Sequence, residues 1–181
     1  MSSQSAISEM RNVMTTLQAR IIPVSIQASN VTASNVPTMP VSEMRGELIP
    51  GKRKAYAMAG DATLTVKNPL TDGRFTYRIG KSDDGKVWFV SVLAGQDNTA
   101  DYRYIGIIGG QSFNSGFRTT AKSAYPADAK CVRAFKWFYS NMESTSVQVW
   151  HEGTCGRCGR KLTVPESIAS GIGPTCASKG L

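Results

Sequence analysis

Three cysteines and one histidine near the end of the 181-residue chain have the side chains and the spacing of a metal site. His151, Cys155, Cys158 and Cys176 form the pattern H-x3-C-x2-C-x17-C. Thiolate sulfur and imidazole nitrogen are donors that zinc prefers, and four of them in so short a segment suit one tetrahedral ion. Four protein ligands leave no position for water, so the predicted role of the Zn2+ is structural.

The fourth ligand has two alternatives. His151 is the only histidine in the chain, and a structural histidine beside the cysteines is the other interpretation of this residue. Cys131 is the rival fourth ligand. Its place on the apolar stripe of a predicted helix makes it a poorer ligand and favours a buried free thiol.

Short elements on both sides of the cysteines are predicted to position them. A strand over 147–150 leads directly to His151. The sequence CGRCG at 155–159 is typical of a zinc knuckle, because its small residues let the backbone turn tightly around the metal. Thr163 and Glu166 match a capping box, which predicts a short helix beginning at this point.

Two glycine positions then shape the end of the site. Gly171 is placed to end the short helix, and Gly173-Pro174 is predicted to turn the chain toward Cys176. Strand, knuckle, helix and final ligand together predict a small closed zinc domain.

Alternating apolar and polar residues between 62 and 108 predict an antiparallel β-meander of about four strands. The predicted strands cover 63–67, 74–79, 87–93 and 102–108. Asp84-Gly85 is a strong hairpin signal between the second and third strands. A helix opening at Pro126 is predicted to cover one face of the sheet. Its apolar stripe consists of Cys131, Ala134, Phe135, Phe138 and Met142. The predicted fold class is therefore α+β.

The segment 109–124, between the last predicted strand and the helix, has two interpretations. It is rich in Gly, Ser and Thr, and it places Phe113 and Phe117 near Arg118 and Lys122. Aromatic side chains beside cations on a loop could stack bases and hold phosphates. The same segment could instead fold back as a lid over the sheet.

The pattern divides the chain into three predicted parts. Apolar residues at helical spacing over 6–19 predict an amphipathic helix, and the Ser-, Thr-, Asn- and Pro-containing stretch 28–40 is typical of a linker. The predicted domains are an N-terminal helix with a flexible linker at 1–50, a basic α+β domain at 51–150, and a Cys3His zinc-binding domain at 151–181.

The formal net charge of +8 comes mainly from the middle of the chain. Residues 51–150 carry 14 Lys or Arg and eight Asp or Glu, whereas 1–50 are balanced. A basic surface indicates an anionic partner, most simply DNA or RNA, although charge spread over a surface can also serve solubility alone. The candidate phosphate contacts are Arg157, Arg160, Lys161, Arg74, Arg78 and Lys136.

Other features restrict the class of protein. No apolar run approaches the roughly 18 residues that span a bilayer, and the N-terminus lacks a basic stretch followed by an apolar one. We therefore expect a cytoplasmic protein without a membrane partner. No phosphate loop, nucleophile–base pair or carboxylate cluster stands out, so we also expect no enzymatic activity.

The segment CGRCGRKLTVPESIASGIGPTC resembles the C-terminal domain of small phage and prophage proteins, a family of unknown function. The family pattern runs CxxCGRxLTxPxS and then GxGPxC. The matching residues are Cys155, Cys158, Gly159, Arg160, Leu162, Thr163, Pro165, Ser167, Gly171, Gly173, Pro174 and Cys176. The β-rich stretch before the segment also resembles such proteins. The resemblance implies a phage origin and a zinc domain, and it brings no established activity. With a phage origin, the cytoplasm that we expect from the missing signal and membrane segments is that of the host cell.

Two functions remain in competition. The leading hypothesis is a small phage-encoded nonenzymatic zinc protein that binds nucleic acid through a basic surface. The alternative is a protein-binding inhibitor or adaptor that acts on a host defence or transcription complex. Affinity for random DNA that falls steeply with salt favours the first, because phosphate contacts release counterions.

Overall fold

A computed structural model describes residues 46–109 and 116–180 of the chain. The predicted helix at 6–19, the linker at 28–40 and Phe113 lie outside these residues. The described part has the α+β class that the sequence predicts, with one antiparallel sheet and a few helices. No helix in this part has the length and apolar composition that crossing a membrane requires.

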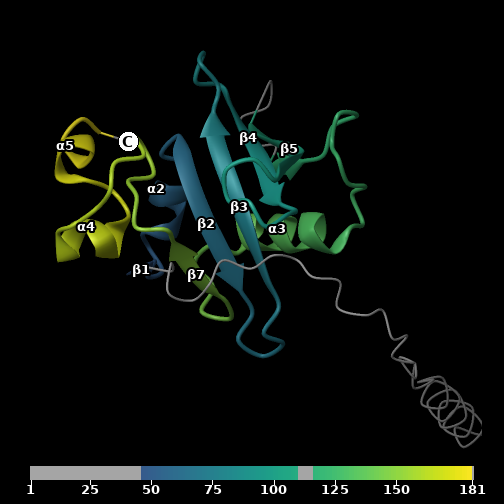
Figure 1. The fold of residues 1–181 in the computed structure, drawn as a ribbon, viewed down its shortest axis with the longest axis horizontal. Helices are drawn as coiled ribbons and strands as arrows, with labels where there is room; N and C mark the ends of the chain where they lie inside the picture. Colours follow the sequence, from purple (N-terminus) through teal and green to yellow (C-terminus); the bar gives the residue numbers. More distant parts are fainter. Residues whose placement is uncertain (1–45, 110–115, 181) are drawn as a thin grey trace, which may run out of the picture. The chain divides into compact units, whose positions relative to one another are not determined.

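The sheet has seven strands in the order β1-β7-β2-β3-β4-β5-β6, and neighbouring strands are antiparallel (Figure 1). The strands are β1 Gly46–Glu47, β2 Asp61–Lys67, β3 Arg74–Lys81, β4 Val87–Leu93, β5 Tyr102–Gly109, β6 Phe117–Arg118 and β7 Gln148–His151. The predicted four-strand meander is present as β2 to β5. The predicted count is wrong, because β6 extends the sheet at one edge and β7 and β1 extend it at the other.

Strand register places the large apolar residues on one face. Leu64 of β2 lies opposite Tyr77 of β3, and Ile79 of β3 lies opposite Val90 of β4. All four side chains are buried. The hairpin between β3 and β4 turns at Gly85, whose φ of 71° lies in the left-handed region that suits glycine.

Helix α3 (Lys130–Ser140) covers this apolar face (Figure 1). Phe135 is fully buried, and its ring centroid lies 4.8 Å from that of Tyr77 and 4.7 Å from that of Phe117. The helix begins at Lys130 and not at Pro126. The residues before it form a turn in which the Ala129 N–H donates to the Pro126 carbonyl.

The apolar stripe of α3 differs slightly from the predicted one. Phe135 and Phe138 are buried as expected, and Val132 is buried as well. Met142 is also buried, but it lies after the last residue of the helix. Cys131 and Ala134 lie at the edge of the stripe and are half-buried.

The end of the segment 109–124 folds onto the sheet. Phe117 is buried against α3 in β6, and an Arg118 guanidinium N–H donates to the Gly109 carbonyl at 2.7 Å. Phe117 is therefore a core residue of the edge strand β6 and not a loop aromatic that is free to stack bases, and β6 continues the sheet at its edge instead of covering a face.

Helix α2 (Arg53–Ala57) carries a buried arginine that connects distant segments. The Arg53 guanidinium donates to four backbone carbonyls, so four of the five N–H donors of this buried cation have partners. These carbonyls belong to Leu48, Met142, Ser144 and Val147. The arginine thereby holds the chain after β1 and the chain before β7 against α2.

The carboxy-terminal segment packs directly on the sheet. Strand β7 lies between β1 and β2, and the Asp61 N–H donates to the Gly156 carbonyl at 2.7 Å. Leu162 and Ile172 belong to the same hydrophobic cluster as α3. Packing and hydrogen bonds thus cross the domain boundary predicted at residue 150, and a separate zinc domain remains only a prediction.

Candidate metal centre

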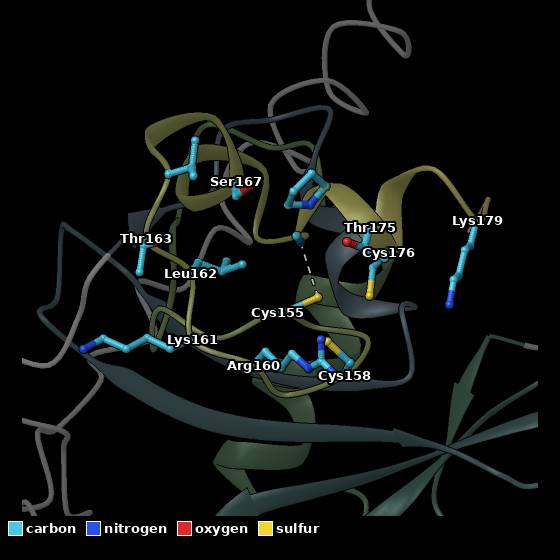
Figure 2. A pocket seen from close by; sticks show the side chains of 13 residues that line it. Cys155, Cys158, Arg160, Lys161, Leu162, Thr163, Ser167, Thr175, Cys176 and Lys179 are labelled. Atoms are coloured by element: carbon cyan, nitrogen blue, oxygen red, sulfur yellow. Dashed lines mark hydrogen bonds between the residues drawn. The ribbon is translucent and has the colours of Figure 1, made fainter.

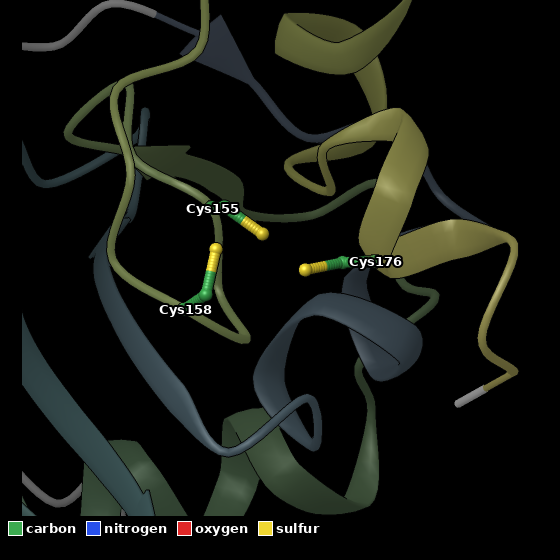
Figure 3. A group of neighbouring side chains, drawn as sticks. All are labelled: Cys155, Cys158 and Cys176. Carbon is green, nitrogen blue, oxygen red and sulfur yellow. The ribbon is translucent and has the colours of Figure 1, made fainter.

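Three cysteine side chains converge in the segment after β7 (Figure 3). Cys155 and Cys158 lie in the knuckle loop, and Cys176 lies in helix α5 (Pro174–Ala177). Their three sulfur atoms are within 4.8 Å of one another. Zinc–sulfur bonds of about 2.3 Å at tetrahedral angles would place sulfurs about 3.8 Å apart. The three thiols therefore lie close enough together to share a metal ion.

The knuckle is a tight loop closed by its own backbone. The Cys155 N–H donates to the Arg160 carbonyl at 2.8 Å, and the Gly159 N–H donates to the Cys155 carbonyl at 2.9 Å. Thr154 and Lys161 pair across the open end of the loop. These bonds hold Cys155 and Cys158 on the same side of the loop, as the sequence predicts.

Two glycines let the segment approach the core closely. The Gly156 N–H donates to the Gly171 carbonyl at 3.0 Å, and both residues lie against the buried ring of Tyr56. A Cβ at Gly156 would come within 2.8 Å of that ring, and one at Gly171 within 2.3 Å. Any side chain at either position would push the knuckle away from α2.

Helix α4 (Pro165–Ser170) ends at Gly171 in the left-handed conformation, as predicted. Its predicted start is wrong. Val164 occupies the N-cap without a side-chain hydrogen bond, so Thr163 and Glu166 form no capping box. The helix instead begins with Pro165 in its first turn. The fixed φ of proline suits a helix, and proline has no backbone N–H that would be left unpaired there.

The predicted turn at 173–174 is the start of α5, which presents Cys176 to the knuckle. Arg157 secures this arrangement, because its guanidinium donates to the Cys176 carbonyl at 3.1 Å and to the Gly180 carbonyl. The short helix is therefore tied to the knuckle loop by a side chain of that loop.

The thiols of Cys155 and Cys176 differ in acidity. Burial raises the pKa of Cys155, but hydrogen bonds from the amides of Gly173, Arg157 and Cys158 outweigh it and lower the pKa to about 7. The Gly173 N–H lies 3.4 Å from the Cys155 sulfur (Figure 2). A hydrogen bond to Cys158 is the main cause that raises the pKa of Cys176 to about 11. A divalent cation would stabilise all three as thiolates.

His151 is not a member of this cluster, so the structure does not bring the predicted fourth ligand together with the three thiols. This histidine is 2% exposed, its Nε2 donates to the Ile168 carbonyl at 2.7 Å, and its Nδ1 accepts from the Gly153 N–H at 3.0 Å. Both ring nitrogens are therefore used, and burial lowers the pKa of this neutral imidazole. A Cβ at Gly46 would fall 2.3 Å from Nε2, so that glycine makes room for the ring.

Cys131, the rival fourth ligand, also lies outside the cluster. It is half-buried on α3, its backbone carbonyl accepts the Tyr77 hydroxyl at 2.8 Å, and burial raises the pKa of its thiol. Its interpretation as a free core thiol is therefore favoured.

Two of the six predicted phosphate contacts are engaged within the protein. Arg157 holds the end of the chain, as described above. The Arg78 guanidinium lies 4.0 Å from the ring centroid of Tyr102 and donates to the Asn98 carbonyl at 3.1 Å.

The other four lie on separate surfaces. Arg160 and Lys161 are exposed in the knuckle, and Lys136 is exposed on α3. Arg74 opens β3, where alternation places it on the face opposite Tyr77 and thus opposite α3. The structure therefore does not join the six residues into one basic surface.

The structure instead gathers cations around an exposed tryptophan on α3. A groove is lined on α3 by Trp137 together with Lys130, Arg133 and Lys136. The turn between β2 and β3 lines the rest of this groove. Trp137 is 42% exposed. The signal for this basic α3 face is present in the sequence, because these residues lie off the apolar stripe of the helix.

Comparisons with known proteins reach only the carboxy-terminal segment. Residues 150–179 match a family model described as a family of unknown function (DUF6011). No curated protein and no solved structure is similar enough to the chain to count as a match. The match covers the three cysteines and thus agrees with the resemblance of this segment, while it adds no activity.

Proposed function

We propose that the chain is a small nonenzymatic protein of phage origin in which one zinc ion stabilises the carboxy-terminal segment and the basic α3 face binds nucleic acid. The phage origin rests on the resemblance of the segment around the cysteines. The observation that carries the nucleic-acid proposal is the exposed Trp137 among the three cations of α3.

The donor set supports zinc. All three cysteines of the cluster are free thiols, and one disulfide would leave the third sulfur without a partner. Three convergent thiolates suit zinc better than a hard cation such as magnesium or calcium, which prefers oxygen.

Charge and exposure support nucleic acid as the partner of the basic α3 face. In the described part of the chain, the ion pairs join Lys67 to Asp72 and Lys86 to Asp84, so they use none of the α3 cations. Phosphates can therefore contact these cations without first breaking an ion pair. An exposed indole among them offers a surface on which an unpaired base can stack.

The knuckle contributes a second, weaker set of cations. Arg160 and Lys161 are exposed beside the cysteines (Figure 2). Three thiolates and one divalent cation carry a net charge of −1 at the same place, which offsets part of their attraction for phosphate. We therefore assign the main contact to the α3 face.

Fluorescence anisotropy of the full zinc-loaded chain with labelled random single-stranded and double-stranded DNA and RNA tests the proposal. We expect affinity that falls steeply with salt, and a logarithmic salt slope that decreases by about 0.7–0.9 for each phosphate that Lys136→Glu no longer neutralises. Trp137→Ala is expected to weaken single-stranded binding most, because it removes the stacking surface.

Lys86→Glu is the matched control. It makes the same charge change in the turn after β3, whereas the groove lies near the turn before β3. The two turns are separated by the length of this strand, which has eight residues and is roughly 26 Å long. Equal loss of affinity in Lys86→Glu and Lys136→Glu would contradict a specific α3 surface. If a nuclease-treated pull-down retained one host protein at stoichiometric yield, the chain would be an inhibitor or adaptor instead.

A further inference from the structure

Among the residues that the structure describes, three side chains are placed to bind a metal at the cluster. The chain contains four cysteines and one histidine, and all five lie in the described residues. His151 uses both ring nitrogens in hydrogen bonds, and Cys131 lies outside the cluster on α3. No carboxylate of the described residues joins the three sulfurs either. Zinc requires a fourth ligand in its usual tetrahedral geometry.

The cluster is open on one side. The three cysteines line a cavity of about 330 Å3, and Cys158 is exposed to solvent. A water molecule takes about 30 Å3 of liquid volume, so the cavity has room for a ligand of several heavy atoms. It is too small for a folded partner to enter.

The walls of this cavity favour a small anion. Arg160, Lys161 and Lys179 line it, and no acidic side chain does. Figure 2 shows Lys161 and Lys179 on opposite sides of the three sulfurs. Leu162 and Pro174 add apolar surface, which suits the carbon atoms of an organic ligand.

We propose that the fourth ligand of the bound metal is a small exogenous thiolate that carries a second negative group. This inference rests on the proposed zinc site. A thiolate is the donor that matches the other three, and the cationic wall would bind its carboxylate. In the exchange, a metal-bound water leaves, the thiol releases its proton to solvent, and its sulfur forms the new bond to the metal. No electron is transferred.

Cobalt substitution of the full chain provides the test. Co2+ bound to cysteines gives thiolate-to-metal charge-transfer absorption whose intensity follows the number of sulfur ligands. We expect the cobalt-loaded chain to show the intensity of three thiolates, and titration with 3-mercaptopropionate to raise it saturably to that of four. Propionate, which lacks the thiol, is expected to leave the spectrum unchanged.

The cationic wall gives a second readout. Lys161→Gln is expected to weaken binding of 3-mercaptopropionate by about two- to fivefold without changing the starting spectrum, as an exposed ion pair would. Binding of the cationic thiol 2-mercaptoethylamine should not weaken in this variant. Lys130→Gln on α3 is the matched control and should behave as the unchanged chain.

Each outcome separates this inference from the proposed function. If the chain binds neither cobalt nor zinc, the metal proposal and this inference both fail. X-ray absorption of the unchanged zinc-loaded chain that shows imidazole scattering, or four sulfurs before any thiol is added, overturns the inference alone. A spectrum that does not respond to 3-mercaptopropionate overturns it as well.

Discussion

The sheet with α3 and the segment after β7 are stabilised in different ways. In the first region, large side chains such as Tyr77, Ile79 and Phe135 are fully buried between a sheet and a helix. In the second, α4 has six residues and α5 has four, which is too short for either helix to be stable alone. Leu162 and Ile172 bring some apolar burial to that segment, and most residues from 158 onward are exposed.

This difference indicates where a metal would act. Hydrophobic burial stabilises the sheet whether or not a metal is present. The carboxy-terminal segment depends on backbone turns, on its contact with Tyr56 and on bringing three thiols together. Metal binding energy should therefore appear as stability of this segment, and mutations in the two regions should give separable effects.

Cys158→Ser should have the largest effect on the metal-dependent region. Structural zinc contributes about 10–16 kcal/mol in zinc-finger peptides, and loss of one thiolate removes much of it. We expect bound zinc to fall from one ion per chain to none. Amide hydrogen exchange should lose protection over 153–180 while β3 and β4 keep theirs.

Cys131→Ser is the control for that change, because its thiol lies outside the cluster. It should retain the zinc. Unchanged metal content and unchanged thermal stability in Cys158→Ser would show that the cysteines do not form a metal site.

Phe135→Ala should give the next largest effect, and it acts on the other region. The ring contacts Tyr77, Phe117 and Phe138 and is fully buried, so its removal leaves a cavity. We expect a loss of about 3–5 kcal/mol in the free energy of unfolding, measured by urea denaturation.

Trp137→Ala on the same helix is the matched control, because its side chain is 42% exposed. We expect it to cost at most about 1 kcal/mol. Equal losses from the two substitutions would mean that α3 does not pack on the sheet by the face described.

The pH dependence of stability should report the buried His151. Its pKa is lowered in the folded state by burial, and protonation of Nδ1 would oppose the Gly153 N–H. The histidine of the unfolded chain, with a pKa of about 6.5, therefore binds a proton at a pH at which the folded chain does not. Stability should be full above that pKa and fall as the pH drops below it, by at most about 1.4 kcal/mol per pH unit.

Urea denaturation of the metal-free chain at pH 7.5 and at pH 5.5 (roughly one unit either side of the histidine pKa) would measure this effect together with the protonation of Cys155, whose pKa of about 7 lies in the same range. His151→Gln should reduce the difference between the two pH values and leave the part that comes from Cys155, and it should cost about 1–3 kcal/mol at the higher pH through its imperfect hydrogen bonds. Stability that rises on acidification would contradict a neutral, hydrogen-bonded imidazole.

Charge reversals on the two basic surfaces should have the smallest effects. Arg160→Glu is expected to weaken nucleic-acid binding while zinc is retained, and Lys136→Glu should weaken it more. Anisotropy titrations at one fixed salt concentration would compare them. Unchanged binding in Arg160→Glu would remove the knuckle from the contact surface and leave the basic α3 face as the sole candidate.

Local patterns in the sequence predicted much of this structure. Alternation locates β2 to β5, because each of these strands has seven or eight residues and is long enough to show a period of two. The two-residue strands β1 and β6 are too short to show a period. The sequence also predicts the end of α4 at Gly171, because glycine readily adopts the left-handed conformation that ends many helices. Gly171 has this conformation in the structure.

The sequence by itself determined which side chains could bind a metal and which stretches form strands, because donor chemistry and hydrophobic period are properties of neighbouring residues. Only the tertiary structure decided which donors meet. Spacing places His151 four residues before Cys155, yet β7 pairs with β1 and β2 and holds its ring against Gly46 and Ile168. In the same way, strand register and helix packing placed Arg74 and Lys136 on opposite faces of the sheet, since the face a residue occupies depends on partners far away in the chain.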